Sequence, residues 1–230
     1  MKKDAWNLER ALEVLCSRGW LSERSKEIQK RLAGIARLRI FEAHEPIYLA
    51  GQNPNGVFGL VEGSVKLAFP RNDGEDYIAH YAGTGFWFGD LALFSNAPRL
   101  VSIHAAEPTT MVQLSPQGIA RLVREDPKLH ADFYALTYAN FRTALSIIAN
   151  LAIVSVDKRI ADRLLLEAAA NPKADGWVHV SQPDLAQLMA VSVPTLRRTI
   201  GRFVRAGLVE QGYGRIKVVD ANGLQNIIRG

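Results

Sequence analysis

The stretch "VSQPDLAQLMAVSVPTLRRTIGRFVRAGLVEQGYGRIKVV", residues 180–219, decides the fold of the last third of the chain. Ser181 is a helix N-cap residue, and Asp184 stands at the reciprocal position of a capping box. After the short turn "AVS", Ser192 caps a second helix, which tolerates Pro194 in its first turn. Two short helices joined by a tight turn predict a helix-turn-helix, and its first helix has an apolar face of Leu185, Leu188 and Met189.

The second helix has two chemically distinct faces when its residues are placed at 100° intervals. Its apolar side carries Leu196, Ile200 and Phe203. The opposite side and its flanks carry Pro194, Arg198, Gly201, Arg205, Arg197 and Arg202. An apolar back with arginines in front suits the DNA major groove, where guanidinium groups pair with guanine edges or phosphates. The alternative is a solvated basic helix in a small α+β domain.

Two further features of this region favour a polyanionic partner. After Gly207, which ends the second helix, "LVE" and "RIKVV" flank the turn "QGYG" and predict a hairpin wing. The net charge of +5 is uneven: residues 157–230 hold 11 Lys and Arg against 7 Asp and Glu, whereas residues 1–156 hold 17 against 16. The excess positive charge therefore lies in the same third of the chain as the predicted helix-turn-helix.

Composition limits the class of protein. A chain of 230 residues that is 48% hydrophobic and 22% charged is typical of one large or two smaller globular domains. No apolar run approaches the roughly 20 residues that span a bilayer, and Lys2-Lys3 is not followed by a signal-peptide core, so we expect neither membrane insertion nor export. Cys16 is the only cysteine, which argues against disulfides, thiolate zinc sites and four-cysteine iron–sulfur clusters within one chain; we expect it to be half-buried.

The middle of the chain predicts β-structure after a helical start. Residues 5–37 have a helical pattern with Ser22 as a cap. From about Arg39 to Leu114, short strand-forming runs alternate with Gly, Pro, Asn and Asp turns, which indicates an antiparallel sandwich or barrel. Tight turns are expected at Gly51, Gly63 and Gly74.

A long helix follows Pro127, because no Gly or Pro occurs from Lys128 through Asn171. One heptad-spaced set of positions holds Leu129, Phe133, Leu136, Asn140, Thr143, Ile147, Asn150 and Val154, and its polar members would fix the register of a two-stranded pair. A second apolar stripe holds Tyr134, Tyr138, Phe141, Leu145, Ile148 and Ala152. Two stripes favour two partners, the β domain and a second copy of the chain, so we expect a homodimer through residues 129–154. The alternative is one helix packed only on its own β domain.

A break is expected at residues 154–157, where Ser155 and Asp157 are good helix caps and form a candidate hinge. The short helix "KRIADRLLLEAAA" and the loop "NPKADG" then lead into the helix-turn-helix. The predicted plan is a sensor with N-terminal helices at 1–126, a dimerisation helix at 127–154 and a DNA-binding domain at 155–230.

The order of these features resembles the catabolite-activator and fumarate-nitrate-reduction regulator family (CRP/FNR). "AGQNPNGVFGLVEGSVKLAF" is similar to that family's β-roll entry, and "NLAIVSVDKRIADRLL" to its junction between dimerisation helix and DNA-binding domain. The resemblance implies an α+β fold with an antiparallel β-roll (double-stranded β-helix), a long dimerisation helix and a winged helix-turn-helix. It also implies a cytoplasmic bacterial homodimeric transcription regulator that binds two-fold symmetric double-stranded DNA and contacts RNA polymerase.

The resemblance assigns expected DNA contacts by position. Ser192 and Thr195 match phosphate contacts, and Val193, Pro194 and Arg198 match base-reading positions, with Arg197 and Arg202 beside them. Val193 and Pro194 cannot form bidentate hydrogen bonds with a base, although either can touch a thymine methyl. We therefore expect Arg198 to discriminate bases, with guanine its preferred partner.

The stretch "FGDLALFSNAPRLVS", residues 88–102, resembles the phosphate cassette of the cyclic-nucleotide members, in which Gly89 and Arg99 are retained. Asp90 replaces a longer glutamate, and Leu100 replaces a hydroxyl residue that bonds the cyclic phosphate. Ala144 and Leu145 align with positions that offer hydroxyls to the purine. The candidate effector pocket comprises Gly89, Asp90, Leu91, Arg99, Leu100, Tyr138, Ala144 and Leu145.

These replacements argue against high-affinity cyclic AMP binding, since loss of the hydrogen bonds could reduce the binding free energy by more than about 4 kcal/mol. The effector is left open, and a cyclic-AMP-responsive regulator that retains the cassette is the alternative. Arg99 has two further options, an ion pair with Asp90 or a different anion.

Two other ligand classes were considered. Trp87, Phe88, Tyr134 and Tyr138 could line a pocket for an aromatic or haem-like ligand, although such residues more often belong to a core. The histidines His44, His80 and His104 are isolated, so no metal site is expected. A β-barrel enzyme or ligand-binding module with a helical association tail is the rival function. It would need a convergent polar or metal site, and the sequence offers none.

Overall fold

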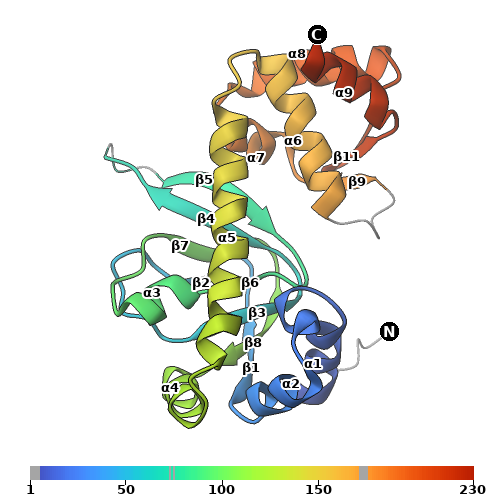
Figure 1. Ribbon diagram of the computed structural model, residues 1–230. Coiled ribbons are helices and arrows are strands. Elements are labelled where there is room, and N and C mark those ends of the chain that lie inside the picture. The colour runs from blue at the N-terminus through green and yellow to red at the C-terminus, as the bar shows by residue number, and fades with distance from the viewer. Residues whose placement is uncertain (1–5, 73, 75, 171–175) are drawn as a thin grey trace. The chain divides into compact units, whose positions relative to one another are not determined.

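The computed structural model describes residues 6–72, 74, 76–170 and 176–230. They form two compact units, one ending at Thr143 and one beginning at Ala144 (Figure 1). The N-terminal lysine pair and most of the predicted loop "NPKADG" lie outside the described residues. Among the described residues, no helix combines the length and the apolar composition of a membrane-spanning segment.

The N-terminal helical region is shorter and more broken than the sequence predicts. It consists of α1 (Leu8–Ser17), the 3-10 helix η1 (Trp20–Glu23) and α2 (Lys26–Ala33). The cap predicted at Ser22 is wrong, because the Ser22 hydroxyl donates to the Gly19 carbonyl inside η1. Ser25 caps α2 instead, since its extended backbone lets the side chain accept from the Ile28 N–H.

Two four-stranded antiparallel sheets form the β-roll, as the sequence predicts. The strand order is β1-β8-β3-β6 in one sheet and β2-β7-β4-β5 in the other. The strands are β1 (Ala36–Phe41), β2 (Pro46–Tyr48), β3 (Val57–Glu62), β4 (Val65–Pro70), β5 (Asp76–Ala82), β6 (Trp87–Phe88), β7 (Ser102–Ala105) and β8 (Thr109–Leu114). In the first sheet, β1 and β8 are in continuous register from Ala36 opposite Leu114 to Phe41 opposite Thr109.

Strand β3 of the first sheet is buried on both faces. Val57 and Val61 of β3 pack in a cluster with the surrounding helices. Phe58 and Leu60 alternate with them and pack with Met111 against residues of the second sheet. The alternation of side chains along a strand thus supplies one layer to each of two cores.

Trp87 joins the roll to the helices beside it. The Trp20 ring of η1 lies 5.3 Å from Trp87 and 5.3 Å from Phe133 of the long helix. The Trp20 indole N–H donates to the Asp132 carbonyl at 2.7 Å. Gly59 makes room for this cluster, because a Cβ at that position would lie 2.5 Å from the Trp87 ring.

The next helices along the chain are α3 (Asp90–Ser95), α4 (Pro116–Glu125) and α5 (Leu129–Leu151), and the boundary between the two units falls within α5. The predicted long helix therefore ends at Leu151 and does not run on to residue 154. The first members of the predicted heptad set, Leu129, Phe133 and Leu136, are at most 2% exposed and pack in their own chain's core. These three residues therefore belong to the stripe that faces the β domain of their own chain.

The polar members of that heptad set also find partners within the chain. The Asn140 amide donates to the Trp87 carbonyl at 3.1 Å and to the Asp90 carboxylate at 2.9 Å. In the second unit, Asn150 is 1% exposed and donates to Asp162 at 2.7 Å. These residues fix the register of α5 against its own chain, and not that of a two-stranded pair.

The second unit surrounds a three-stranded antiparallel sheet of order β10-β11-β9 with helices (Figure 1). Its elements are α6 (Val156–Ala170), β9 (Trp177–His179), α7 (Gln182–Leu188), α8 (Val193–Arg205), β10 (Val209–Gly212), β11 (Arg215–Val218) and α9 (Ala221–Arg229). The helical conformation is interrupted between α5 and α6, where the Ser155 hydroxyl accepts from the Lys158 N–H. Helix α9 was not predicted; Asp220 caps it.

Candidate nucleic-acid interface and sensor site

Helices α7 and α8 form the predicted helix-turn-helix. The Ser181 side chain accepts from the Asp184 N–H at 3.2 Å, and its hydroxyl donates to the Asp184 carboxylate at 2.5 Å. Ala190 adopts a positive φ of 50° in the turn. Ser192 then caps α8 by accepting from the Thr195 N–H at 3.3 Å. The caps predicted from the sequence thus set both helix starts.

Helix α8 is buried along one face and exposed along the other. Its buried face consists of Leu196, Thr199, Ile200 and Phe203, each no more than 3% exposed. Arg198 and Arg205 are exposed on the other side, and neither forms an ion pair or hydrogen bond with any described residue. Two unpaired guanidinium groups are therefore available to an anionic partner.

The other two arginines of α8 are held within the second unit. Arg197 donates through Nε to the Gln182 side chain at 2.8 Å. Arg202 donates to the Asp157 carboxylate and, at 3.0 Å, to the Thr199 hydroxyl. The arginine face predicted from the sequence thus contains two free and two engaged side chains.

The predicted wing is the hairpin of β10 and β11. Tyr213 lies at its turn and is fully exposed. On the sheet, the Arg215 guanidinium lies 4.2 Å from the centre of the Trp177 ring, and the Lys217 ammonium lies 5.9 Å from it. The wing therefore adds cationic groups beside a rigid aromatic side chain.

Arg99 in the predicted phosphate cassette is buried and bonded to its own chain. It is 3% exposed, and its guanidinium donates to the Gly89 carbonyl at 2.7 Å and to the Gly56 carbonyl and Asn55 side chain at 2.8 Å each. Its other face lies 4.0 Å from the centre of the Tyr48 ring. Burial lowers the pKa of Arg99. The ion pair with Asp90, one of the two further options for Arg99, does not form.

Gly89 permits this arrangement. Its φ is 97°, and a Cβ there would lie 2.7 Å from the Gly56 carbonyl oxygen and 2.9 Å from an Arg99 nitrogen. The absence of a side chain at Gly89 thus leaves room for the Arg99 guanidinium.

Asp90 turns toward the long helix. Its carboxylate accepts from the Thr137 hydroxyl at 2.5 Å and from the Asn140 amide at 2.9 Å, and the residue is 2% exposed. Burial raises the pKa of Asp90, and the two hydrogen bonds oppose that rise. Leu91 and Leu100, by contrast, point outward and are 51% and 67% exposed.

Comparison with known families agrees with both halves of this geometry. The cyclic nucleotide-binding domain model matches residues 38–126, which include the β-roll and the cassette. The Crp-like helix-turn-helix domain model matches residues 158–227. The chain belongs to the CRP/FNR family of transcription regulators. CRP/FNR proteins bind DNA, are typically dimers and are not enzymes, so the rival enzyme function is excluded.

Relatives of this CRP/FNR regulator cover most of its length. The cAMP-activated global transcriptional regulator Vfr of Pseudomonas aeruginosa is 26% identical over 201 residues, which are 84% of this chain and 91% of that protein. The transcriptional regulator SdrP of Thermus thermophilus is 28% identical over 175 residues, 74% and 82% of the two chains. The structure of FixK2 from Bradyrhizobium japonicum shares the fold with a TM-score of 0.73 at 19% identity, and covers 84% of this chain and 96% of that one.

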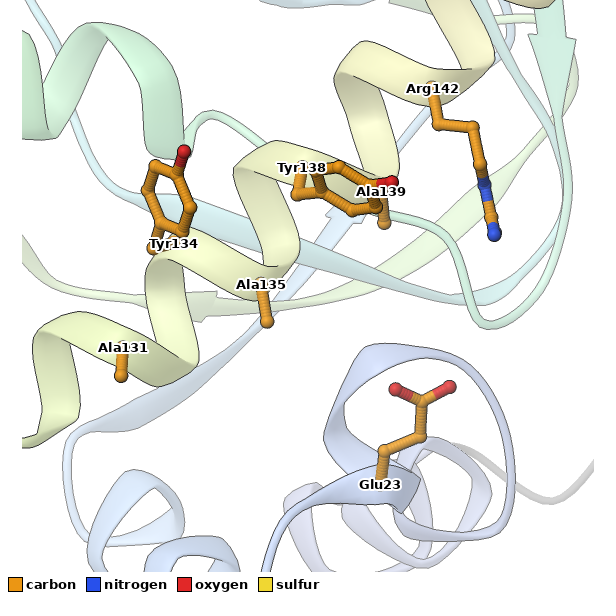
Figure 2. A pocket seen from close by; sticks show the side chains of 7 residues that line it. All are labelled: Glu23, Ala131, Tyr134, Ala135, Tyr138, Ala139 and Arg142. Carbon is orange, nitrogen blue, oxygen red and sulfur yellow. The ribbon is translucent and has the colours of Figure 1, made fainter.

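The aromatic pocket considered for this regulator does not form. Trp87 and Phe88 are 1% and 3% exposed within the two cores, whereas Tyr134 and Tyr138 are 73% and 62% exposed. Tyr134 and Tyr138 of α5 line one pocket together with Glu23 (Figure 2). Among the described residues, no group of three or more His, Cys, Asp or Glu is placed to hold a metal ion.

Several residues that shape these sites were missed by the sequence analysis. Asn55 and Gly56 bind Arg99 from a turn, and Thr137 binds Asp90 from α5. The turn signal "NPN" marks the first site, but nothing local identifies its partner. Ala144 and Leu145 belong to the other compact unit and carry no polar side-chain atoms.

Proposed function

We propose that this CRP/FNR regulator binds a two-fold symmetric DNA site as a homodimer, with α8 of each copy in successive major grooves. The observation that carries the proposal is the exposed face of α8, where Arg198 and Arg205 have no partner among the described residues while the opposite face is buried. An unpaired guanidinium on a rigid helix is preorganised for guanine or phosphate.

The proposed contacts divide into two kinds. Ser192, Thr195 and Arg197 contact phosphates, and the capping hydroxyl of Ser192 lies 2.9 Å from that of Thr195 at the start of α8. Arg198 reads a base, and Val193 and Pro194 touch the groove beside it. Phosphate contacts position the helix, and base contacts specify the sequence.

The proposed dimer interface is the exposed apolar stripe of α5. Tyr134, Tyr138, Phe141, Leu145 and Ile148 are each at least 49% exposed, although all are large apolar side chains. Their alternating spacing of four and three residues suits a parallel pair of helices. The three-part plan of residues 1–126, 127–154 and 155–230, with a hinge at Ser155 and Asp157, belongs to the same proposal.

We infer that high-affinity cyclic AMP is not the signal, although several relatives carry cAMP-activated in their names. A cyclic phosphate would have to take Arg99 from the Gly56 and Gly89 carbonyls and from Asn55. Those acceptors would then lose their donor inside the protein, at about 1–3 kcal/mol for each unsatisfied group. Leu100 offers no hydroxyl in return. The proposal also includes contact with RNA polymerase and a cytoplasmic location, because bacterial transcription takes place in the cytoplasm.

The test is selection of duplex DNA from a random pool by the purified full-length protein, followed by titration of the selected duplex at several salt concentrations. The expected outcome is an imperfect palindrome, bound with an affinity that falls steeply as salt rises. Failure to retain any duplex at low salt, with or without cyclic nucleotides, would refute the proposed function.

A further inference from the structure

Arg202 is directed into a hydrogen-bonded triangle with two other residues of the second unit. The Asp157 carboxylate accepts from the Thr199 hydroxyl at 3.0 Å and from the Arg202 guanidinium. The same guanidinium nitrogen donates to the Thr199 hydroxyl at 3.0 Å. Each member of the triangle therefore contacts both others.

Burial makes the triangle more than a surface ion pair. Thr199 is 1% exposed on the apolar face of α8, so its hydroxyl needs a partner inside the protein. Asp157 supplies that partner, while its own side chain and that of Arg202 are 39% and 43% exposed. The triangle thus connects a buried hydroxyl, that of Thr199, to two partly exposed charged side chains.

The triangle joins two elements that matter for DNA binding. Asp157 is the second residue of α6, directly after the break that follows α5, and Thr199 and Arg202 lie in α8. Without such a connection, α8 could rotate about its axis or slide against α6 while keeping its apolar contacts, because hydrophobic contacts are not directional. The Asp157 carboxylate accepts from Thr199 and from Arg202, which lie one turn apart on α8, and these two bonds restrict both movements.

We propose that Asp157 and Arg202 are positioning residues, which hold the recognition helix α8 against the first turn of α6, and that Arg202 does not bind a DNA phosphate. The inference rests on the proposed DNA-binding function and changes the role expected for Arg202. Arg198 and Arg205 then carry the arginine contacts to DNA, assisted by Arg197.

The positioning role and simple charge attraction predict opposite effects of substituting Asp157, so one substitution distinguishes them. Asp157→Asn removes a negative charge beside α8, so simple attraction to DNA would tighten binding. If Asp157 positions α8, the same substitution weakens binding. Arg202→Met keeps the length of the side chain and removes its donors.

The first experiment titrates the selected duplex and a shuffled duplex with full-length wild type, Asp157→Asn, Arg202→Met and the double variant. Each single variant is expected to bind the selected duplex about tenfold more weakly, with a smaller loss on the shuffled duplex. The double variant should lose no more than either single variant, because both remove one unit. The slope of log Kd against log salt should stay at the wild-type value in Arg202→Met and fall by about one in Arg197→Met, which serves as the reference for a lost phosphate contact.

A fall of the slope by about one in Arg202→Met, or tighter binding by Asp157→Asn, would overturn the proposal and make Arg202 a phosphate contact for which Asp157 competes. Amide hydrogen exchange in the absence of DNA supplies a second measurement. Both single variants should speed exchange along residues 193–205 and leave the β-roll unchanged; unchanged exchange in α8 would also overturn the proposal. If the wild type selected no duplex, the proposed function would fail while the exchange result still decided whether the triangle holds α8.

Discussion

At the scale of single residues, Arg99 illustrates how a binding position can become a structural one. A guanidinium that is 3% exposed must be hydrogen-bonded, because burying an unpaired charge is costly. The two terminal nitrogens of Arg99 donate to two backbone carbonyls and to the Asn55 side chain, whereas its buried Nε has no partner among the described residues. The bonds connect the turn at residues 55–56 to the start of α3, so Arg99 stabilises the part of the β-roll where a nucleotide phosphate would otherwise be held.

Gly89→Ala should destabilise the first unit more than a positive φ alone explains. The new Cβ would collide with the Gly56 carbonyl and with Arg99, in addition to the backbone strain at φ 97°. We expect a loss of about 3 kcal/mol in the free energy of unfolding, measured by urea denaturation. Gly51→Ala is the matched control, since Gly51 has a φ of 82° and no atom within 4 Å of a Cβ; it should lose only about 1 kcal/mol. Equal losses would mean that the contact with Arg99 is unimportant.

Arg198→Ala should weaken binding to the selected duplex by about 1–3 kcal/mol and flatten the preference at one base pair. The physical reason is the loss of a bidentate donor from the exposed face of α8. Repeating the selection with the variant measures the preference directly. Arg121→Ala, on α4 of the other unit, removes the same charge and should change neither affinity nor preference. A loss that is uniform across all sequences would assign Arg198 to a phosphate.

At the scale of elements, α5 has two apolar faces with different partners. One face is buried against the helices and sheet of its own chain through Leu129, Phe133 and Leu136. The other face is exposed in the single chain. Both stripes have heptad spacing, so periodicity alone does not say which one meets a second copy. The contacts of Asn140 with Trp87 and Asp90 turn the first stripe toward its own chain.

Ile148→Glu should convert the homodimer into a monomer. Ile148 is 62% exposed and is the last of the large side chains in the exposed stripe of α5. A carboxylate there would be buried without a partner in a dimer. Sedimentation velocity at several protein concentrations measures the change in mass. Ile40→Glu is the matched control, since Ile40 is 63% exposed on β1 and should leave the dimer intact. A dimer that survives Ile148→Glu would place the interface elsewhere.

At the scale of the whole molecule, the regulator consists of two units, each of which contains hydrogen bonds between its own charged and polar side chains. In the sensor, Arg99 and Asp90 are bonded within the first unit. In the DNA-binding part, Asp157, Thr199 and Arg202 are bonded within the second. Both terminal nitrogens of Arg99 already donate to acceptors of its own chain, which favours DNA binding in the absence of cyclic AMP.

Cyclic AMP should therefore change neither the thermal unfolding temperature nor the affinity for the selected duplex. A ligand present at 100 times its Kd would stabilise the protein by about 2.7 kcal/mol, an effect that differential scanning calorimetry detects easily. The expected result is no shift at concentrations that saturate cAMP-activated regulators. A clear rise in the unfolding temperature, together with tighter DNA binding, would support the alternative of a retained nucleotide site.

The sequence by itself determined the elements whose causes are local. Capping at Ser181 and Ser192, the two faces of α8 and the alternation of the strands depend on residues a few positions apart, so the order of the fold and the DNA-facing helix could be predicted. Only the tertiary structure decided the partners of the charged side chains. Asn55 lies 44 residues from Arg99, Thr137 lies 47 from Asp90, and Asp157 lies 45 from Arg202. Such pairs form because packing brings distant elements together, and neither propensity nor periodicity specifies which side chains then meet.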